Sequence, residues 1–436
     1  MTLPILTAVT DASWEADLVA GLAGSDLGVT VVRRCVDVAD LLAAAAARTA
    51  EAVVLSADLR RLDRAALAQL ASAGVAVVAL VEPGDEPAER RLRQLGVGTV
   101  LATDAGAAAI AIALQAAVVT ARADALAGPL ADPLAALPRL DAPMAGPALP
   151  RGGGRIVAIW GPTGAPGRTT VAVGLADEAS RMGVSTMLVD ADTYGGSIGQ
   201  VLGFLDESPG LAAATRLAGN GRLDLPALAG LARGTDPWLR VLTGIVRADR
   251  WPELSGDAVE AVLDLCRRLA TLVVVDCGFS LEQDEEIVYD TAAPRRNAAA
   301  LAALTAADTI LVVGAADPVG MHRLIRGLAE FRELAVTGVP RVVVNKLRRG
   351  VTPGDPATEL AAALRRHAGV DNPVLLPYDR TALDRAIGVG KSLADVAPGS
   401  ALRRGLTELA AGVAGVAPPS TQRSRRRVAA WAPAAP

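Results

Sequence analysis

The sequence predicts an α/β protein with two parallel or mostly parallel sheets, one in each of two domains. Short apolar runs typical of buried strands alternate with segments of helical periodicity along most of the chain. A stretch with a proline every few residues, 123–153, separates two such series. The length of 436 residues agrees with this division, because a single hydrophobic core rarely grows beyond about 250–300 residues.

The first series, residues 1–122, contains five strand–helix units. The expected strands are Ile5–Val9, Val29–Arg33, Ala52–Leu55, Val75–Leu80 and Thr99–Ala102. The expected helices are Glu15–Ala23, Val38–Ala47, Arg64–Ala73, Pro87–Leu95 and Ala105–Thr120. This alternation predicts a doubly wound parallel sheet of the flavodoxin-like type.

These five units resemble a response-regulator receiver domain, but the residues needed for phosphotransfer are missing. The third strand ends in Ser56, where a receiver has its phosphate-accepting aspartate. The acidic pair after the first strand is reduced to Asp11, and Thr103 and Asp104 follow the fifth strand in place of a lysine. Asp58 comes two residues too late and is expected to face solvent. We interpret the domain as a degenerate receiver-like domain that contacts other proteins.

Residues 123–153 and 417–436 are not expected to join a folded core. Proline cannot continue a helix or donate to a sheet, so 123–153 is interpreted as a linker with some transient helix. The last segment has proline at both ends and four arginines between them: Arg423, Arg425, Arg426 and Arg427. We expect a disordered basic tail; the alternative is a weak contact with an anionic membrane through these arginines, Val428 and Trp431.

The second series, residues 154–416, begins with a strand, a glycine-containing loop and a helix. Ile156–Trp160 is the expected strand, and Thr169 and Thr170 open the helical segment. The loop contains three glycines: Gly161, Gly164 and Gly167. Successive backbone N–H groups of such a loop converge with the positive end of the helix and form an anion site. A hydroxyl just inside the helix is placed to ligate a Mg²⁺ bound to a nucleotide.

Acidic residues stand at the ends of two later strands. Ser185–Val189 is followed by Asp190 and Asp192, and the apolar strand Leu272–Asp276 itself ends in an acid. Because ligands gather at the carboxyl edge of open α/β sheets, we expect these acids to lie near the glycine loop. The alternative for the Asp190–Asp192 pair is a helix cap or a surface turn.

Three further strands complete the second series, and polar residues follow two of them. The strands are Thr309–Gly314, Arg341–Val344 and Val374–Leu376. Asn345 follows the second of these and Asp379 the third. The same edge of the sheet is therefore predicted to carry an amide and a further carboxylate.

Together these motifs resemble the MinD/ParA group of deviant Walker-A ATPases over residues 154–416. The loop of that group reads K-G-G-x-G-K-[ST]-T. The matching positions are Gly164, Gly167, Thr169 and Thr170. The sequence departs from the pattern in three places: Thr163 stands where the signature lysine is expected, Ala165 replaces a glycine and Arg168 replaces the second lysine.

The resemblance implies that this domain binds ATP and Mg²⁺. The nucleotide would contact Gly164, Ala165, Pro166, Gly167, Arg168, Thr169 and Thr170. The implied metal ligands are Thr169, Asp190 and Asp276. Asp192 would position the attacking water, and Arg168 would supply the catalytic charge of the missing lysine. Asn345 would read the adenine edge, and Asp379 would contact the nucleobase unless it only caps a helix.

With the receiver-like domain in front, the whole chain resembles the CpaE/TadZ branch of this group. That resemblance implies a nucleotide-switched positioning protein, which acts in polar localisation or assembly of a Flp/Tad-type pilus and hydrolyses ATP slowly or not at all. A septum-site-determining regulator of cell division and a non-hydrolysing scaffold remain alternatives. A DNA-segregation ATPase is disfavoured, because the second domain has no concentrated basic run.

The implied partners are a second copy of the chain, joined in an ATP-dependent homodimer, and proteins of a secretion, pilus or division machinery bound through the N-terminal domain. Leu281–Asn297 is acidic at first and then carries Arg295 and Arg296. This segment is expected to be either a solvated loop or a dimer contact in which an arginine such as Arg296 replaces the signature lysine.

Composition limits the remaining possibilities. The net charge of −4 gives no general attraction to nucleic acid. The three cysteines match no metal or redox spacing. No apolar run approaches the roughly 18–20 residues that span a bilayer, and the first residues lack a basic region typical of a signal peptide. We therefore expect a cytoplasmic protein; a polar or membrane-associated position through its partners is left open.

Overall fold

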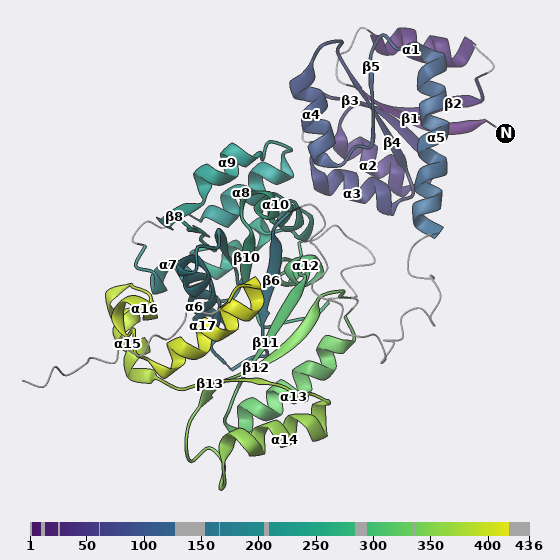
Figure 1. Ribbon diagram of the computed structural model, residues 1–436. Helices are drawn as coiled ribbons and strands as arrows, with labels where there is room; N and C mark the ends of the chain where they lie inside the picture. The colour runs from purple at the N-terminus through teal and green to yellow at the C-terminus, as the bar shows by residue number, and fades with distance from the viewer. Residues whose placement is uncertain are drawn as a thin grey trace, which may run out of the picture.

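The computed structural model describes residues 2–9, 14–24, 27–60, 62–126, 153–164, 166–204, 209–283, 294–334 and 336–417. These residues form two α/β domains (Figure 1). Some expectations lie outside the described residues: those for Asp11, Ala165, residues 284–293, most of the predicted linker and nearly all of the predicted tail.

The first sheet contains five parallel strands in the order β2-β1-β3-β4-β5. Its strands are β1 (Leu3–Ala8), β2 (Val29–Cys35), β3 (Ala52–Ser56), β4 (Ala76–Val81) and β5 (Thr99–Ala102). Its helices are α1 (Trp14–Gly24), α2 (Val38–Ala46), α3 (Arg64–Ser72), α4 (Glu86–Leu95) and α5 (Ala107–Leu126). This strand order is that of flavodoxin-like sheets, whereas the likeness to a receiver remains an interpretation.

Local sequence explains where these helices begin. Asp37, Asp63 and Asp85 each accept a hydrogen bond from the backbone N–H three residues later, which satisfies one of the free donors of the first helical turn. Apolar residues of α2, α3 and α4 cover one face of the sheet, and those of α1 and α5 cover the other. Helix α5 continues to Leu126, past the predicted domain boundary at residue 122.

The second sheet contains eight strands in the order β13-β12-β11-β6-β10-β7-β9-β8. Its strands are β6 (Arg155–Trp160), β7 (Thr186–Ala191), β8 (Arg233–Asp236), β9 (Leu239–Leu242), β10 (Leu272–Cys277), β11 (Thr309–Ala315), β12 (Val339–Leu347) and β13 (Val374–Pro377). All neighbours pair in parallel except β8 and β9, so the predicted mostly parallel sheet is confirmed. The β8–β9 hairpin was not anticipated, because β8 is exposed throughout and shows no alternation.

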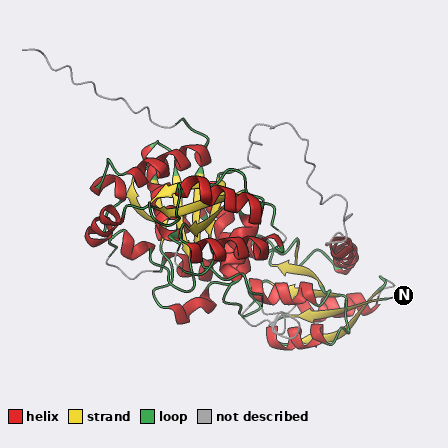
Figure 2. Cartoon of the chain, turned by 90° about the horizontal axis from the view of Figure 1, so that it is seen from below, coloured by secondary structure: helices red, strands yellow, loops and turns green. Residues whose placement is uncertain are grey.

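Helices cover both faces of this sheet (Figure 2). One layer contains α8 (Gly210–Gly219), α9 (Leu225–Leu231), α10 (Gly256–Leu269), α12 (Ala298–Ala306), α13 (Pro318–Arg332) and α14 (Pro356–Ala368). The other contains α6 (Arg168–Arg181), α7 (Ile198–Val201), α15 (Arg380–Val389), α16 (Leu393–Val396) and α17 (Ala401–Ala414). The 3₁₀ helix η1 (Ala248–Glu253) precedes α10. None of the helices that the structure describes combines the length and apolar character needed to cross a bilayer.

The two domains meet at Arg91 of α4. Its guanidinium donates to the carbonyl oxygens of Ala57 and Leu62 in the first domain and, at 3.2 Å, to that of Asn220 in the second. Gly221 has a φ of +64°, and a Cβ atom at this position would lie 2.8 Å from the carbonyl oxygen of Arg91. The turn after α8 therefore packs closely against α4, where only glycine fits.

Candidate functional site

The predicted loop joins β6 to α6 at the carboxyl edge of the second sheet. Strand β10 lies between β6 and β7, so the ends of all three strands are adjacent. In this register Asp276 pairs directly with Asp190 and with Ile159. Strand β7 extends through Asp190, which the sequence analysis had placed just after the strand. The sheet therefore brings the two acids together beside the first turn of α6, as expected.

Thr169 and Asp276 are joined by a hydrogen bond. The threonine hydroxyl donates to Oδ2 of Asp276 at 2.6 Å, and Asp276 is 1% exposed. Its other oxygen, Oδ1, is buried without a hydrogen-bond partner. A buried, unpaired carboxylate oxygen is suited to bind a cation, because buried carboxylates are normally paired or bound to a metal.

The residues present suit Mg²⁺ bound together with a nucleotide. Among the described residues, no group of three or more His, Cys, Asp or Glu side chains is arranged to hold a metal ion. Mg²⁺ is typically bound through one or two carboxylates together with phosphate groups and water. Thr169 and Asp276 could hold it in this way, with Asp190 nearby.

Asp190 is also buried, with an exposure of 1%. Its Oδ1 accepts from the backbone N–H of Asp192 at 3.3 Å, and its Oδ2 accepts from that of Ile198 at 3.0 Å. Gly244 packs so closely that a Cβ there would lie 2.7 Å from the Asp190 carboxyl carbon. Burial raises the pKa of Asp190 to about 7, and burial together with the charge of Asp190 raises the pKa of Asp276 as well.

These raised pKa values predict that Asp276→Asn stabilises the ligand-free protein at pH 8. An unfolded aspartate has a pKa of about 3.9, so the folded state binds more protons than the unfolded state between about pH 4 and pH 7. The stability that protonated Asp190 contributes is therefore fully present below about pH 4 and is lost as the pH rises through about 7, and the stability from Asp276 changes with pH in the same direction. Asparagine removes the buried charge that causes this loss.

Thermal unfolding between pH 4.5 and pH 8 checks this prediction. The gain in melting temperature of Asp276→Asn over the unmodified chain should grow as the pH rises. Asp264→Asn on α10 is the matched control, because Asp264 is exposed and its substitution should change the melting temperature little. A gain for Asp276→Asn that does not depend on pH would contradict the assignment of a costly buried charge.

Arg168 links the loop to the carboxyl ends of β10 and β7. Its side chain is 12% exposed and forms an ion pair with Asp192 at 3.4 Å. It also donates to the carbonyl oxygen of Cys277 at 3.1 Å, to that of Gly161 at 3.2 Å and to that of Pro162 at 3.4 Å. In this structure the guanidinium therefore binds protein oxygens rather than standing free above the loop.

The backbone of the loop is left-handed at two glycines. Gly164 has a φ of +105° and Gly167 a φ of +97°. A Cβ on Gly167 would collide with the amide nitrogen of Asn345, which donates to the carbonyl oxygen of Pro166 at 2.9 Å. Asn345 is 4% exposed, and its hydrogen bond to Pro166 holds the loop in place. Its predicted contact with adenine stays a prediction.

The N-terminus of α6 remains available to an anion. Gly167 occupies the N-cap position, where no side chain accepts from the helix. The first N–H groups of a helix have no acceptor within it, so those of Arg168, Thr169 and Thr170 point toward the loop. Pro166 contributes no N–H. The loop therefore has one backbone donor fewer than it would have with any other residue at this position.

The segments after β7 and β10 contact each other through aromatic and amide groups. The rings of Tyr194 and Phe279 lie 4.6 Å apart, and the Tyr194 hydroxyl donates to Asn297 at 2.8 Å. The guanidinium of Arg296 lies 4.0 Å from the centre of the Tyr194 ring of the same chain. Thr193 donates to the carbonyl oxygen of Arg296 at 3.0 Å. The predicted dimer contact of Arg296 remains a prediction.

Asp379 has a structural role at the start of α15. It is the N-cap of α15 and accepts from the backbone N–H of Ala382 at 3.2 Å. Its second oxygen accepts from the Ser400 hydroxyl at 2.7 Å. The helix-capping alternative is therefore what the structure shows, and contact with a nucleobase remains a prediction.

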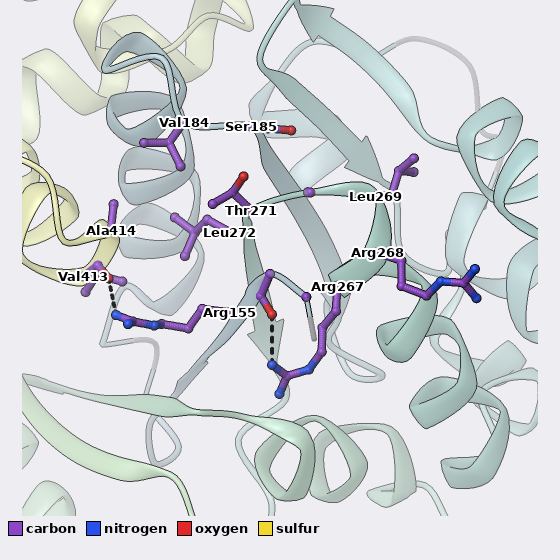
Figure 3. Close-up of a pocket in the computed structure, with 13 residues that line it drawn as sticks. Arg155, Val184, Ser185, Arg267, Arg268, Leu269, Thr271, Leu272, Val413 and Ala414 are labelled. Atoms are coloured by element: carbon purple, nitrogen blue, oxygen red, sulfur yellow. Dashed lines mark hydrogen bonds between the residues drawn. The ribbon is translucent and has the colours of Figure 1, made fainter. Parts of the chain in front are cut away.

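Among the described residues, cavities lie at both edges of the sheet. A groove of about 820 Å³ runs beside the loop between α13 and the segment after β10, lined among others by Pro162, Thr163 and Phe279. A hollow of about 500 Å³ lies at the amino edge, near Arg155 and Arg267 (Figure 3). Arg155 donates to Val413 and Arg267 to Gly154 there, so these guanidiniums already have partners. The candidate site is therefore the carboxyl edge.

Comparison with solved structures agrees with this topology, although no protein-family model and no curated protein matches the sequence. A ParA family ATPase from Chlorobium tepidum TLS matches 59% of this chain and 98% of its own, with 17% identity and a TM-score of 0.51. The second domain has the ParA-type fold. The cell division ATPase MinD of Pyrococcus furiosus also matches (17% identity, 61% of this chain, 100% of its own, TM-score 0.47). So does the septum site-determining protein MinD complexed with Mg-ADP from Pyrococcus horikoshii OT3 (16%, 59%, 95%, TM-score 0.46).

The sequence predicted where the loop and the acidic residues lie on this ParA-type fold. It did not predict which groups Arg168 contacts or that Arg323 lies near the loop. Arg323 of α13 lies against Gly164. The only sequence signal for it was the Asp317-Pro318 start of a helix after β11, which places α13 beside the loop.

Proposed function

We propose that the chain is an ATP-binding, nucleotide-switched positioning protein of the CpaE/TadZ kind, which acts in polar localisation or assembly of a Flp/Tad-type pilus. The observation that carries this proposal is the Thr169–Asp276 hydrogen bond beside the uncapped N-terminus of α6, with Oδ1 of Asp276 buried and unpaired. This arrangement suits a phosphate group with its cation. The ParA-type fold, shared with an ATPase, supports ATP as the nucleotide.

Each residue of the site has a proposed part. The N–H groups at the start of α6 would bind phosphate oxygens, and Thr169, Asp276 and Asp190 would hold Mg²⁺. Mg²⁺, when bound there, supplies positive charge to the phosphate groups. Asp192 would orient a water molecule once its ion pair with Arg168 opens, because the pair at 3.4 Å occupies both side chains. We expect slow hydrolysis, since both lysines of the group's loop are absent.

The proposed switch acts through association. ATP would favour a homodimer, and the N-terminal domain would carry the contacts to a pilus, secretion or division machinery in the cytoplasm. That domain is unsuited to phosphotransfer, because Ser56, buried at the end of β3, donates to Asp58 instead of presenting a carboxylate. The two domains are in direct contact where Gly221 packs closely against Arg91.

Two alternatives are considered, and a particular observation favours the first. A scaffold without hydrolysis is favoured by Arg168, whose guanidinium is engaged by Asp192 and three carbonyl oxygens. A septum-site-determining role is an alternative within the same fold, which the ParA-type sheet supports equally well. Hydrolysis assays distinguish the first alternative, and localisation to a pole or to mid-cell distinguishes the second.

The test of the proposed function is sedimentation of the full chain with and without ATP and Mg²⁺. We expect a larger dimer fraction with ATP and Mg²⁺, because the phosphate groups would occupy the anion-binding site and contact both copies. Asp276→Ala should weaken this response, since it removes the carboxylate that would hold the metal. The matched control Asp264→Ala changes an exposed acid on α10 and should leave the response intact.

A dimer fraction that is the same with and without ATP, in both the unmodified chain and Asp276→Ala, would favour the scaffold. Equilibrium binding of a fluorescent ATP analogue to the same proteins separates a failure to bind from a failure to associate. If the chain binds the analogue but does not associate, the proposed nucleotide site stands and the proposed nucleotide-dependent association is wrong.

A further inference from the structure

The loop between β6 and α6 has no free cation of its own. Thr163 stands where the group's signature lysine is expected, and Arg168 is engaged by Asp192 and by backbone carbonyl oxygens. Terminal phosphate groups carry several negative charges, which a site of this kind must meet with positive charge beyond backbone N–H groups. A cation from another part of the chain would complete the site.

Arg323 of α13 is placed to do this. Helix α13 follows β11, the neighbour of β6 in the sheet, so its first turns stand beside the loop. A Cβ added to Gly164 would collide with Nη1 of Arg323 and lie 3.3 Å from its Cζ. The guanidinium therefore lies directly against Gly164. The left-handed φ of Gly164 is a second, independent reason for glycine at this position.

Arg323 is also available for a ligand. Its side chain is exposed, and within the described part of the chain it forms no hydrogen bond and no ion pair. It lines both the groove beside the segment after β10 and a small hollow that includes Thr163 and Gly164. Arg326, the other arginine of the groove, is paired with Glu330 at 3.1 Å.

We propose that Arg323 binds the terminal phosphate of the nucleotide from within the same chain and takes the place of the signature lysine missing at Thr163. The inference rests on the proposed function and adds a phosphate-binding residue to it. A guanidinium suits this role, because its planar set of donors matches phosphate oxygens in bidentate fashion. Since Arg323 belongs to the same chain as the loop, its contribution to ATP affinity does not require a dimer.

The experiment compares ATP and ADP affinities of the full chain with those of Arg323→Ala, Arg323→Lys and Arg326→Ala, by calorimetry with Mg²⁺ at protein concentrations below dimerisation. We expect Arg323→Ala to weaken ATP binding by about tenfold or more and ADP binding much less, since the terminal phosphate is the group contacted. Arg323→Lys should retain part of the affinity. Arg326→Ala, one turn along the same helix, should bind both nucleotides as the unmodified chain does.

The outcomes separate this inference from the function on which it rests. ATP affinity unchanged in Arg323→Ala, in a protein whose unmodified form binds ATP, would overturn the role of Arg323 and leave the proposed function intact. Equal losses for ATP and ADP would also overturn it, because they would place Arg323 away from the terminal phosphate. An unmodified chain that binds no ATP would overturn both. Matching circular dichroism and melting temperatures confirm that each variant is folded.

Discussion

Replacing Arg168 by alanine should lower the affinity for ATP by roughly 100-fold or more. Each hydrogen bond that a charged group such as the Arg168 guanidinium forms contributes about 1.5–3 kcal/mol. A loss of about 1.4 kcal/mol in binding free energy lowers the affinity tenfold. The change also leaves Asp192, which is 6% exposed, without its cation, and it frees the carbonyl oxygens of Gly161 and Cys277 from their donor. Both effects act on the loop that would hold the phosphate groups.

Titration with a fluorescent ATP analogue measures this loss, with Arg168→Lys as the matched control. Lysine retains the charge and restores the residue of the group's pattern, so we expect it to keep most of the affinity, although its single ammonium cannot reproduce every contact of the guanidinium. Unchanged ATP affinity in Arg168→Ala would remove this loop from the nucleotide site. Melting temperatures of both variants separate a local loss of binding from loss of the fold.

Replacing Gly167 by alanine should nearly abolish ATP binding for a different reason. The backbone at Gly167 is left-handed, and an added Cβ would collide with the amide nitrogen of Asn345. The strained backbone alone costs roughly 1–3 kcal/mol. The collision forces either the loop or Asn345 to move, which breaks the hydrogen bond to Pro166 and displaces the first N–H groups of α6.

Gly183→Ala is the matched control for this prediction. Gly183, just after the other end of α6, also has a positive φ (+78°), but a Cβ there meets nothing within 4 Å. This variant carries the backbone strain without the collision, so it should lower the melting temperature while its ATP affinity stays that of the unmodified chain. Equal ATP affinities for Gly167→Ala and the unmodified chain would show that the loop geometry does not determine binding.

The sequence predicted the architecture of both domains, because buried strands and amphipathic helices leave a local pattern. Every strand and helix expected in the first domain is present, with ends that differ by a few residues. In the second domain the sequence pattern also predicted the strands at whose ends Asp190, Asp276 and Asn345 lie. Their convergence could be predicted as well, since parallel strands present their carboxyl ends at one edge of a sheet.

Some short elements of the second domain were not predicted. The strands β8 and β9 and the helices α8 and α9 lie at one end of the second domain and were not anticipated. Strand β8 is exposed at all of its positions, so burial imposes no period of two on it. Strand β8 is stabilised by its antiparallel pairing with β9, and this pairing depends on the fold around the hairpin.

The sequence by itself determined which residues with charged or polar side chains stand at the carboxyl edge of the second sheet; only the tertiary structure decided what those side chains contact. Arg168 forms an ion pair with Asp192, Asn345 donates a hydrogen bond to Pro166, and Arg323 lies against Gly164. The physical reason is that a strand's period fixes which residue reaches an edge, whereas the direction of a long side chain depends on neighbours that come from distant parts of the chain. Arg323 is 159 residues from Gly164 (323 minus 164), a separation over which no local pattern operates.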